Sequence, residues 1–227
     1  MKQKFTILFD LDGTLVDTAP DLMLAHNHVM KKFGYPTKTT EDIRNLVGKG
    51  AGALIGRSIW GQAKKEFSKV LDDKIKDEMV KEFINFYGKN INNESTLING
   101  VKEFLIWCKD QNISMAVCTN KQEHLSNDLL KKIGIYDFFE YVAGSNTFDY
   151  CKPDPRHLTN VVEILDGDVK KTIMIGDSET DANAAKAAEI PVILLENGYT
   201  EKNTTEIYHN HLIKDFVGIE KIITKYL

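Results

Sequence analysis

The segment that most constrains the fold is an apolar run at residues 5–9 that leads directly into the sequence DLDGT at residues 10–14. A short apolar run of this kind is typical of a buried strand. Two carboxylates at the end of such a strand lose hydration, so they need a cation, a hydrogen-bond network or a reaction to offset that cost. Gly13 permits a tight turn directly after them. The simplest interpretation is a metal-assisted reaction centre at the carboxyl end of a sheet.

Five apolar runs are predicted to be strands, and amphipathic segments with helical spacing separate the last four. The predicted strands are residues 5–9, 114–118, 141–143, 172–175 and 192–195. Helical apolar faces are predicted within residues 101–108, 125–133 and 158–165. Continuous apolar strands that alternate with amphipathic helices favour a mainly parallel sheet covered on both faces. We therefore predict an α/β fold with three layers.

A long interval without a convincing strand lies between the first and second predicted strands. Its helical signals are the stripe Leu22, Ala25, Val29 and Phe33, a possible cap at Thr39 or Thr40, and the series Ile75, Met79, Phe83 and Phe86. The polar residues 90–95 are predicted to be the return linker. We predict a helical domain at residues 17–93, inserted into an α/β core domain formed by residues 1–16 and 94–227.

Glycines are concentrated at positions 48, 50, 52 and 56 within the predicted insertion. No predicted strand precedes them and no Lys-Ser or Lys-Thr pair follows, so they do not fit a nucleotide-binding loop. Two interpretations stay open. The segment is either a turn that brings its backbone and Lys49 close to a ligand, or a simple connection between helices.

Polar residues follow three of the later predicted strands, and the ends of parallel strands meet at one edge of a sheet. Thr119 and Asn120 can bind a phosphoryl oxygen or cap a helix. Lys152 stands beside Pro153 in the sequence CKPDP, where it is either a fixed ammonium group or an exposed loop residue. Asp177 and Asp181 suit either a metal site or the acidic first turn of a helix.

The remaining composition excludes several classes of protein. The formal net charge of -4 gives no general electrostatic case for binding nucleic acid or anionic membranes. No apolar run approaches the ~18 residues that span a bilayer, and the N-terminal residues lack the order of a signal peptide. The three cysteines have no CxxC spacing, which argues against a disulfide framework or a cysteine-based zinc site. We expect a cytoplasmic protein.

Taken together and in order, these motifs resemble the haloacid dehalogenase-like (HAD) hydrolase superfamily. The sequence FDLDGTLVDT is highly specific to that superfamily, and the resemblance covers essentially the whole chain. Within the superfamily, the segments IGDSETDANAAKAA, CTNK, CKPDP and RNLVGKGAGALI look most like phosphoglycolate phosphatases. The resemblance implies a Rossmann-like core with an inserted helical cap domain, and an enzyme that hydrolyses phosphoric monoesters.

The resemblance also implies roles for individual residues. Asp10 would be the nucleophile that forms an aspartyl-phosphate, and Asp12 would be the general acid and base. Mg²⁺ would be held by the Asp10 carboxylate, the backbone carbonyl of Asp12, and Asp177, with Asp181 binding or orienting that group. The residues implied to bind the phosphoryl group or the substrate are Gly13, Thr119, Asn120 and Lys152.

A carboxylate at position 12 argues for phosphoryl transfer, because the dehalogenases of this superfamily lack one there. The predicted reaction is hydrolysis of a small phosphorylated metabolite, most simply 2-phosphoglycolate to glycolate and phosphate. The alternatives are a pyrophosphatase, a sugar-phosphate phosphatase, a β-phosphoglucomutase-like enzyme or, remotely, a non-catalytic receiver-like binding module. Lys49, or alternatively Arg44, is predicted to bind a second anionic group of the substrate. We expect a monomer or homodimer with no nucleic-acid or membrane partner.

Overall fold

The core of the molecule is a six-stranded parallel sheet with the strand order β5-β4-β1-β6-β7-β8. The structure is a computed structural model that describes residues 4–63 and 73–227. All five predicted strands are confirmed, whereas the short edge strand β8 was not predicted. The strands are β1 (Thr6–Phe9), β4 (Ser114–Cys118), β5 (Tyr141–Ala143), β6 (Thr172–Gly176), β7 (Val192–Leu195) and β8 (His211–Ile213).

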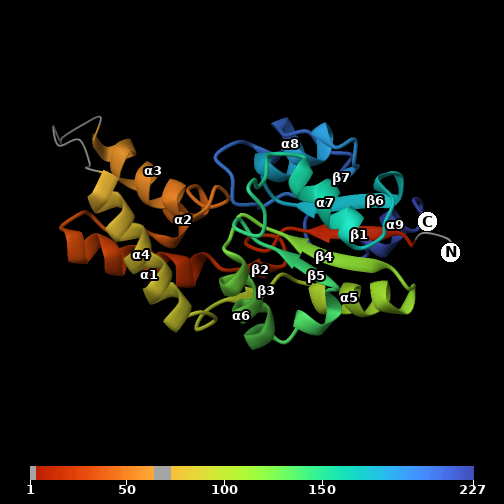
Figure 1. The fold of residues 1–227 in the computed structure, drawn as a ribbon, viewed down its shortest axis with the longest axis horizontal. Helices are drawn as coiled ribbons and strands as arrows, with labels where there is room; N and C mark the ends of the chain where they lie inside the picture. The colour runs from red at the N-terminus through yellow and green to blue at the C-terminus, as the bar shows by residue number, and fades with distance from the viewer. Residues whose placement is uncertain (1–3, 64–72) are drawn as a thin grey trace.

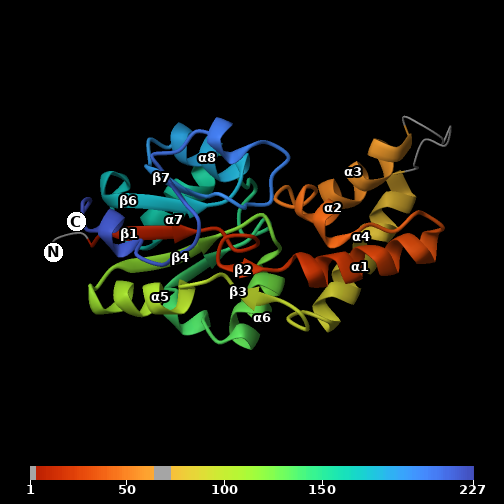
Figure 2. The same cartoon turned by 180° about the vertical axis from the view of Figure 1, so that it is seen from behind.

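Helices cover both faces of this sheet, as predicted (Figures 1 and 2). Alternate residues of a strand point to opposite faces, so Ile7 and Phe9 pack into one hydrophobic cluster while Leu8 packs into another. The first cluster includes residues of α5 (Val101–Asp110), α6 (Glu123–Ile133) and α9 (Glu220–Ile223). The second includes residues of α7 (Arg156–Ile164) and α8 (Glu179–Ala187). The continuous apolar runs therefore follow from burial on both sides.

A helical insertion follows β1 and lies at the end of the molecule opposite the two chain termini (Figure 1). The chain enters it through β2 (Val16–Asp17) and returns through β3 (Thr96–Leu97), and these two short strands pair antiparallel. Its helices are α1 (Ala19–Phe33), α2 (Thr40–Arg44), α3 (Ala51–Ala63) and α4 (Asp73–Lys89). The exact boundaries of the two domains stay a prediction, and residues 1–3 and 64–72 of those domains lie outside the described residues.

A buried carboxylate fixes the return of the chain from the insertion to the core. Asp21 of α1 accepts hydrogen bonds from the backbone N–H groups of Glu94 and Ser95, at 3.0 Å each, and from the Ser95 hydroxyl at 2.6 Å. The carboxylate is 2% exposed, so these bonds compensate for its lost hydration. They hold the predicted linker against the start of the insertion.

Helices α1, α2 and α4 of the insertion follow the sequence signals with local differences, whereas α3 was not predicted. Thr39 caps α2, because its hydroxyl accepts a hydrogen bond from the backbone N–H of Asp42. The buried face of α4 is formed by Met79, Phe83 and Tyr87, whereas Ile75 is 41% exposed. Of the four clustered glycines, those at positions 48 and 50 form a turn with positive φ and those at 52 and 56 lie inside α3.

The described part of the chain contains no helix that is both long enough and apolar enough to cross a membrane. Its three cysteines are free thiols, as their spacing predicted, and Cys108 and Cys118 are buried in the core.

Candidate active site

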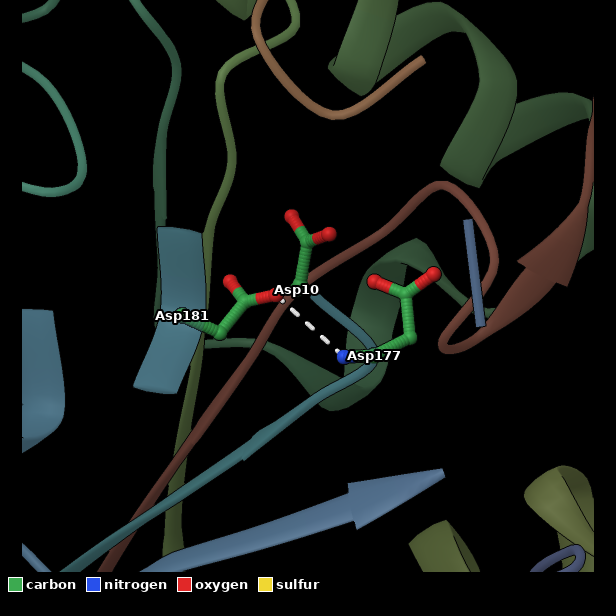
Figure 3. Close-up of side chains that lie close together, drawn as sticks. All are labelled: Asp10, Asp177 and Asp181. Carbon is green, nitrogen blue, oxygen red and sulfur yellow. Dashed lines mark hydrogen bonds between the residues drawn. The ribbon is translucent and has the colours of Figure 1, made fainter. Parts of the chain in front are cut away.

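Three buried carboxyl groups meet at the carboxyl edge of the sheet, beyond the ends of two adjacent strands. Asp10 follows β1, Asp177 follows β6, and Asp181 lies in the first turn of α8. One oxygen from each residue lies within 4.8 Å of the others, and none of the three residues is more than 5% exposed. Figure 3 shows the three carboxyl groups side by side. The sequence predicted this convergence from the parallel order of the strands.

Asp181 caps a helix, as one of its two sequence interpretations predicted, and it also belongs to this carboxylate group. One of its oxygens accepts hydrogen bonds from the Ser178 N–H at 3.0 Å, the Ser178 hydroxyl at 2.7 Å and the Asp177 N–H at 3.2 Å. The last of these is the dashed line in Figure 3. These bonds form the capping box of α8 and fix the carboxyl group. A side chain at Gly176 would overlap Asp181, because a Cβ there would lie 2.4 Å from the Asp181 Cβ.

Lys152 is a buried residue of this group, and the exposed-loop interpretation is therefore wrong. The residue is 3% exposed, and its Nζ lies 2.8 Å from Asp10 Oδ1 and 2.6 Å from Asp181 Oδ1. Burial lowers the pKa of the ammonium group, but pairing with Asp10 and Asp181 more than offsets this, so its pKa lies above the ordinary value. Lys152 is accordingly a fixed positive charge between two carboxylates.

The site still carries more negative than positive charge. Burial raises the pKa of Asp10 to about 6, against the lowering effect of Lys152. Burial also raises the pKa of Asp177 well above its ordinary value, and the neighbouring Asp10 and Asp181 carboxylates add to this rise. Buried carboxylates this close together are unfavourable unless a cation or protons neutralise them. This group therefore has the charge and the hard oxygen donors that suit Mg²⁺.

Gly13 is required because two other residues occupy the space beside it. Its φ is 83°, and a Cβ at this position would lie 2.2 Å from Asp177 Oδ2 and 2.8 Å from Tyr199 Cγ. The Tyr199 N–H donates a 2.6 Å hydrogen bond to the same Asp177 oxygen. Its hydroxyl contacts Asp17 and accepts a hydrogen bond from the Ala19 N–H. Tyr199 thus joins the carboxylate group to the start of the insertion.

Asp12 lies beside this group, but its carboxylate has other partners. Lys121 Nζ lies 2.7 Å from Asp12 Oδ1 and 2.9 Å from Oδ2, and the Thr18 hydroxyl donates to Oδ1 at 2.7 Å. Neither Lys121 nor Tyr199 was predicted as a site residue. The sequence did carry a signal for each of them. Lys121 stands in the sequence CTNK, and Tyr199 follows β7 at the same edge of the sheet.

Thr119 and Asn120 lie at the end of β4, and neither caps the following helix, because α6 begins after Gln122. Thr119 is 1% exposed and its hydroxyl accepts a hydrogen bond from the Lys121 N–H at 3.2 Å. The Asn120 amide donates to the carbonyl of Lys152 at 2.9 Å and to that of Gly48 at 3.1 Å. Asn120 therefore links the loop that carries Lys152, the lysine loop, to the turn at Gly48 and Gly50 of the insertion, the glycine turn.

A cavity of about 280 Å³ lies between the core and the insertion. Asp10, Asp12 and Thr119 line it from the core, and Lys49 lines it from the glycine turn. Lys49 is exposed and has no ion-pair partner among the described residues. Arg44 lies elsewhere. It pairs with Asp17 at 2.7 Å and lines a second cavity at the start of the insertion.

Comparisons with known proteins agree with this arrangement. A family model described as haloacid dehalogenase-like hydrolase matches residues 7–195. A phosphoglycolate phosphatase of Mesorhizobium japonicum is 37% identical over 210 residues, which cover 92% of this chain and 90% of the relative. A phosphoglycolate phosphatase of Caulobacter vibrioides is 38% identical over 216 residues, covering 95% of this chain and 89% of the relative.

Solved structures share the same fold. A predicted phosphoglycolate phosphatase from Haemophilus somnus superposes with a TM-score of 0.90 at 31% identity, covering 98% of this chain and 99% of the other. A β-phosphoglucomutase from Clostridium difficile superposes with a TM-score of 0.78 at 22% identity, covering 98% and 97%. The second similarity concerns the fold alone, because different chemistries occur on one fold.

Proposed function

This chain belongs to the haloacid dehalogenase-like hydrolase family, and from that premise we propose that it is a Mg²⁺-dependent phosphatase whose substrate is 2-phosphoglycolate. It is a hydrolase similar to phosphoglycolate phosphatases along most of its length. The observation that carries the proposal is the buried group of Asp10, Asp177 and Asp181 with Lys152, of which Asp10 lines a cavity that suits a small substrate.

The charge of this group supports the metal. Asp10 and Asp177 would hold Mg²⁺, the backbone carbonyl of Asp12 would add a further oxygen, and Asp181 would orient the group through its bonds to Ser178. When bound, Mg²⁺ would neutralise charge on the phosphoryl oxygens. The Asp12 side chain is occupied by Lys121 and Thr18, which supports a different task for that carboxyl group.

The two aspartates after β1 would divide the chemistry between them. A carboxylate oxygen of Asp10 attacks phosphorus, so that the new P–O bond forms as the bond to the alkoxide of the substrate breaks. Asp12 gives its proton to the leaving alkoxide. It then takes a proton from the water that attacks the phosphorus of the aspartyl-phosphate, which releases phosphate and regenerates Asp10.

The remaining polar groups would bind the phosphoryl oxygens. Lys152 supplies a positive charge that is already desolvated and fixed by two carboxylates, so little reorganisation is needed in the transition state. The Thr119 hydroxyl and the Asn120 backbone N–H would donate hydrogen bonds to the same oxygens. The side chain of Asn120 has a separate task, since it joins the lysine loop to the insertion.

A substrate panel tests the proposal. We would measure kcat/KM with Mg²⁺ for 2-phosphoglycolate, pyrophosphate, glucose 6-phosphate, β-glucose 1-phosphate and para-nitrophenyl phosphate. The highest value is expected for 2-phosphoglycolate, and Asp10→Asn is expected to abolish turnover of every substrate. A higher value for pyrophosphate or a sugar phosphate would refute the substrate, while no turnover of any phosphomonoester would refute the whole class.

A further inference from the structure

Lys121 is a buried ammonium group that the proposed chemistry leaves without a task. It lies in the loop after β4, its side chain is 5% exposed, and it lines the cavity. Its Nζ contacts both oxygens of Asp12, at 2.7 and 2.9 Å, and lies 4.5 Å from the centre of the Tyr87 ring on α4. A buried ion pair adds little net stability compared with apolar residues of similar size, so stability alone does not account for it.

The ammonium group stays charged at this position. Burial lowers the pKa of Lys121, but pairing with Asp12 and the nearby Tyr87 more than offset that effect, and its pKa lies above the ordinary value. A charged group this deeply buried needs an anionic partner at all times. The only carboxylate that contacts it among the described residues is Asp12, the residue whose oxygen must reach the ester oxygen of the substrate.

If Asp12 protonates the ester oxygen, as in the proposed mechanism, Lys121 lies beside the leaving group. A general acid acts within about 3 Å of the atom that it protonates. Because Lys121 Nζ lies within 2.9 Å of both Asp12 oxygens, a group attached to the carbon next to the ester oxygen lies within its reach. In 2-phosphoglycolate that group is a carboxylate. An uncharged group at the same place cannot replace Asp12 as the anionic partner of the Lys121 ammonium group.

The other lysine at the cavity, Lys49, is less suited to this task. It is exposed, and the pairing of an exposed ammonium with a carboxylate is weak because water and salt screen it. Lys121 is already desolvated, so a carboxylate that replaces Asp12 keeps the ammonium paired at little extra cost. The difference in burial therefore favours Lys121 as the residue that distinguishes substrates.

We propose that Lys121 selects phosphomonoesters with a carboxylate on the carbon next to the ester oxygen, by exchanging its ion pair with Asp12 for one with that carboxylate. The inference rests on the proposed function and narrows it to a substrate class. On binding such a substrate, Asp12 keeps its hydrogen bond from Thr18 and is released from Lys121 to contact the ester oxygen. Selection would thus couple recognition of the leaving group to release of the general acid.

The test compares 2-phosphoglycolate with ethyl phosphate, in which a methyl group replaces the carboxylate. In Lys121→Met, kcat/KM for 2-phosphoglycolate is expected to fall about 10- to 100-fold more than kcat/KM for ethyl phosphate, the range of a buried charge-assisted hydrogen bond. Lys49→Met, a lysine of the same cavity, is the matched variant and is expected to keep the wild-type ratio between the two substrates.

A binding measurement covers the case in which Lys121→Met fails to fold because Asp12 loses its partner. The double variant Asp12→Asn, Lys121→Met removes both charges of the pair, and calorimetry would compare it with Asp12→Asn alone. The double variant is expected to bind 2-phosphoglycolate about 10- to 100-fold more weakly, while its affinity for ethyl phosphate changes by less than about threefold.

The outcomes separate this inference from the proposed function. An equal loss for both substrates would mean that Lys121 only positions Asp12, and a selective loss in Lys49→Met instead would assign the carboxylate to Lys49. Either result overturns the inference and leaves the proposed function intact. If the wild-type enzyme does not prefer 2-phosphoglycolate to ethyl phosphate, the proposed function fails as well.

Discussion

Replacing Lys152 by methionine removes one ammonium group from between two buried carboxylates. Lys152 Nζ lies 2.8 Å from Asp10 and 2.6 Å from Asp181, and all three side chains are at most 8% exposed. Removing one partner of a buried ion pair costs about 3–5 kcal/mol, because the other partner keeps its desolvation penalty. Two carboxylates lose a partner here, so we expect the upper end of that range, about 5 kcal/mol, in the metal-free protein near neutral pH.

Urea denaturation followed by circular dichroism, in the presence of a chelator, measures this loss. The double variant Lys152→Met, Asp181→Asn is the control, because it also removes one of the two carboxylates that lose their ammonium partner. We expect this variant to recover about 2 kcal/mol of the lost free energy of unfolding. The loss is also expected to shrink as the pH is lowered through about 6, since protonation neutralises Asp10. A loss below about 1 kcal/mol in Lys152→Met at neutral pH would refute the idea that this ammonium neutralises the group.

Three further predictions concern the same edge of the sheet. First, the pKa of Asp10 is about 6 in the folded chain and 3.8 in the unfolded chain, so the folded chain binds more protons between these two pH values. Without metal, the free energy of unfolding should therefore fall as the pH rises from about 4 to about 6. Mg²⁺ should therefore raise the melting temperature more near pH 7.5 than near pH 5, and an equal rise at both values would contradict this. Second, Gly13→Ala should cost at least about 1–3 kcal/mol in chemical denaturation and weaken Mg²⁺ binding in calorimetry, because its Cβ would meet Asp177 and Tyr199. Unchanged Mg²⁺ affinity would show that this contact does not position Asp177. Third, Tyr199→Phe should cost about 1–2 kcal/mol in urea denaturation, because the hydroxyl bonded to Asp17 and to the first N–H of α1 is lost. No loss would mean that water replaces these bonds.

The sequence predicted the parts of the site that depend on the order of the strands. Asp10 and Asp177 follow apolar runs that pair as neighbours in a parallel sheet, so their convergence follows from topology. The environment of Lys152 did not follow in this way. Its loop looks like an exposed turn in the sequence, and its burial depends on contacts with residues that are distant in the chain.

Other features were missed for identifiable physical reasons. Gly52 and Gly56 have low helix propensity, yet they lie inside the helix α3. This helix packs against α4, which also packs against α1. The edge strand β8 has only three residues, which gives too short a pattern to recognise. Lys121 contacts Asp12, and Tyr199 contacts Asp17 and Asp177, and these contacts join residues that are distant in the chain.

In the proposed mechanism, Asp10 carries the phosphoryl group during turnover. This step is tested most directly by quenching the enzyme in acid during hydrolysis of 2-phosphoglycolate and analysing its peptides by mass spectrometry. We expect one phosphoryl group on the peptide that contains Asp10, lost on treatment with hydroxylamine and absent from Asp10→Asn. Phosphate on another residue, or hydrolysis that continues in Asp10→Asn, would contradict it.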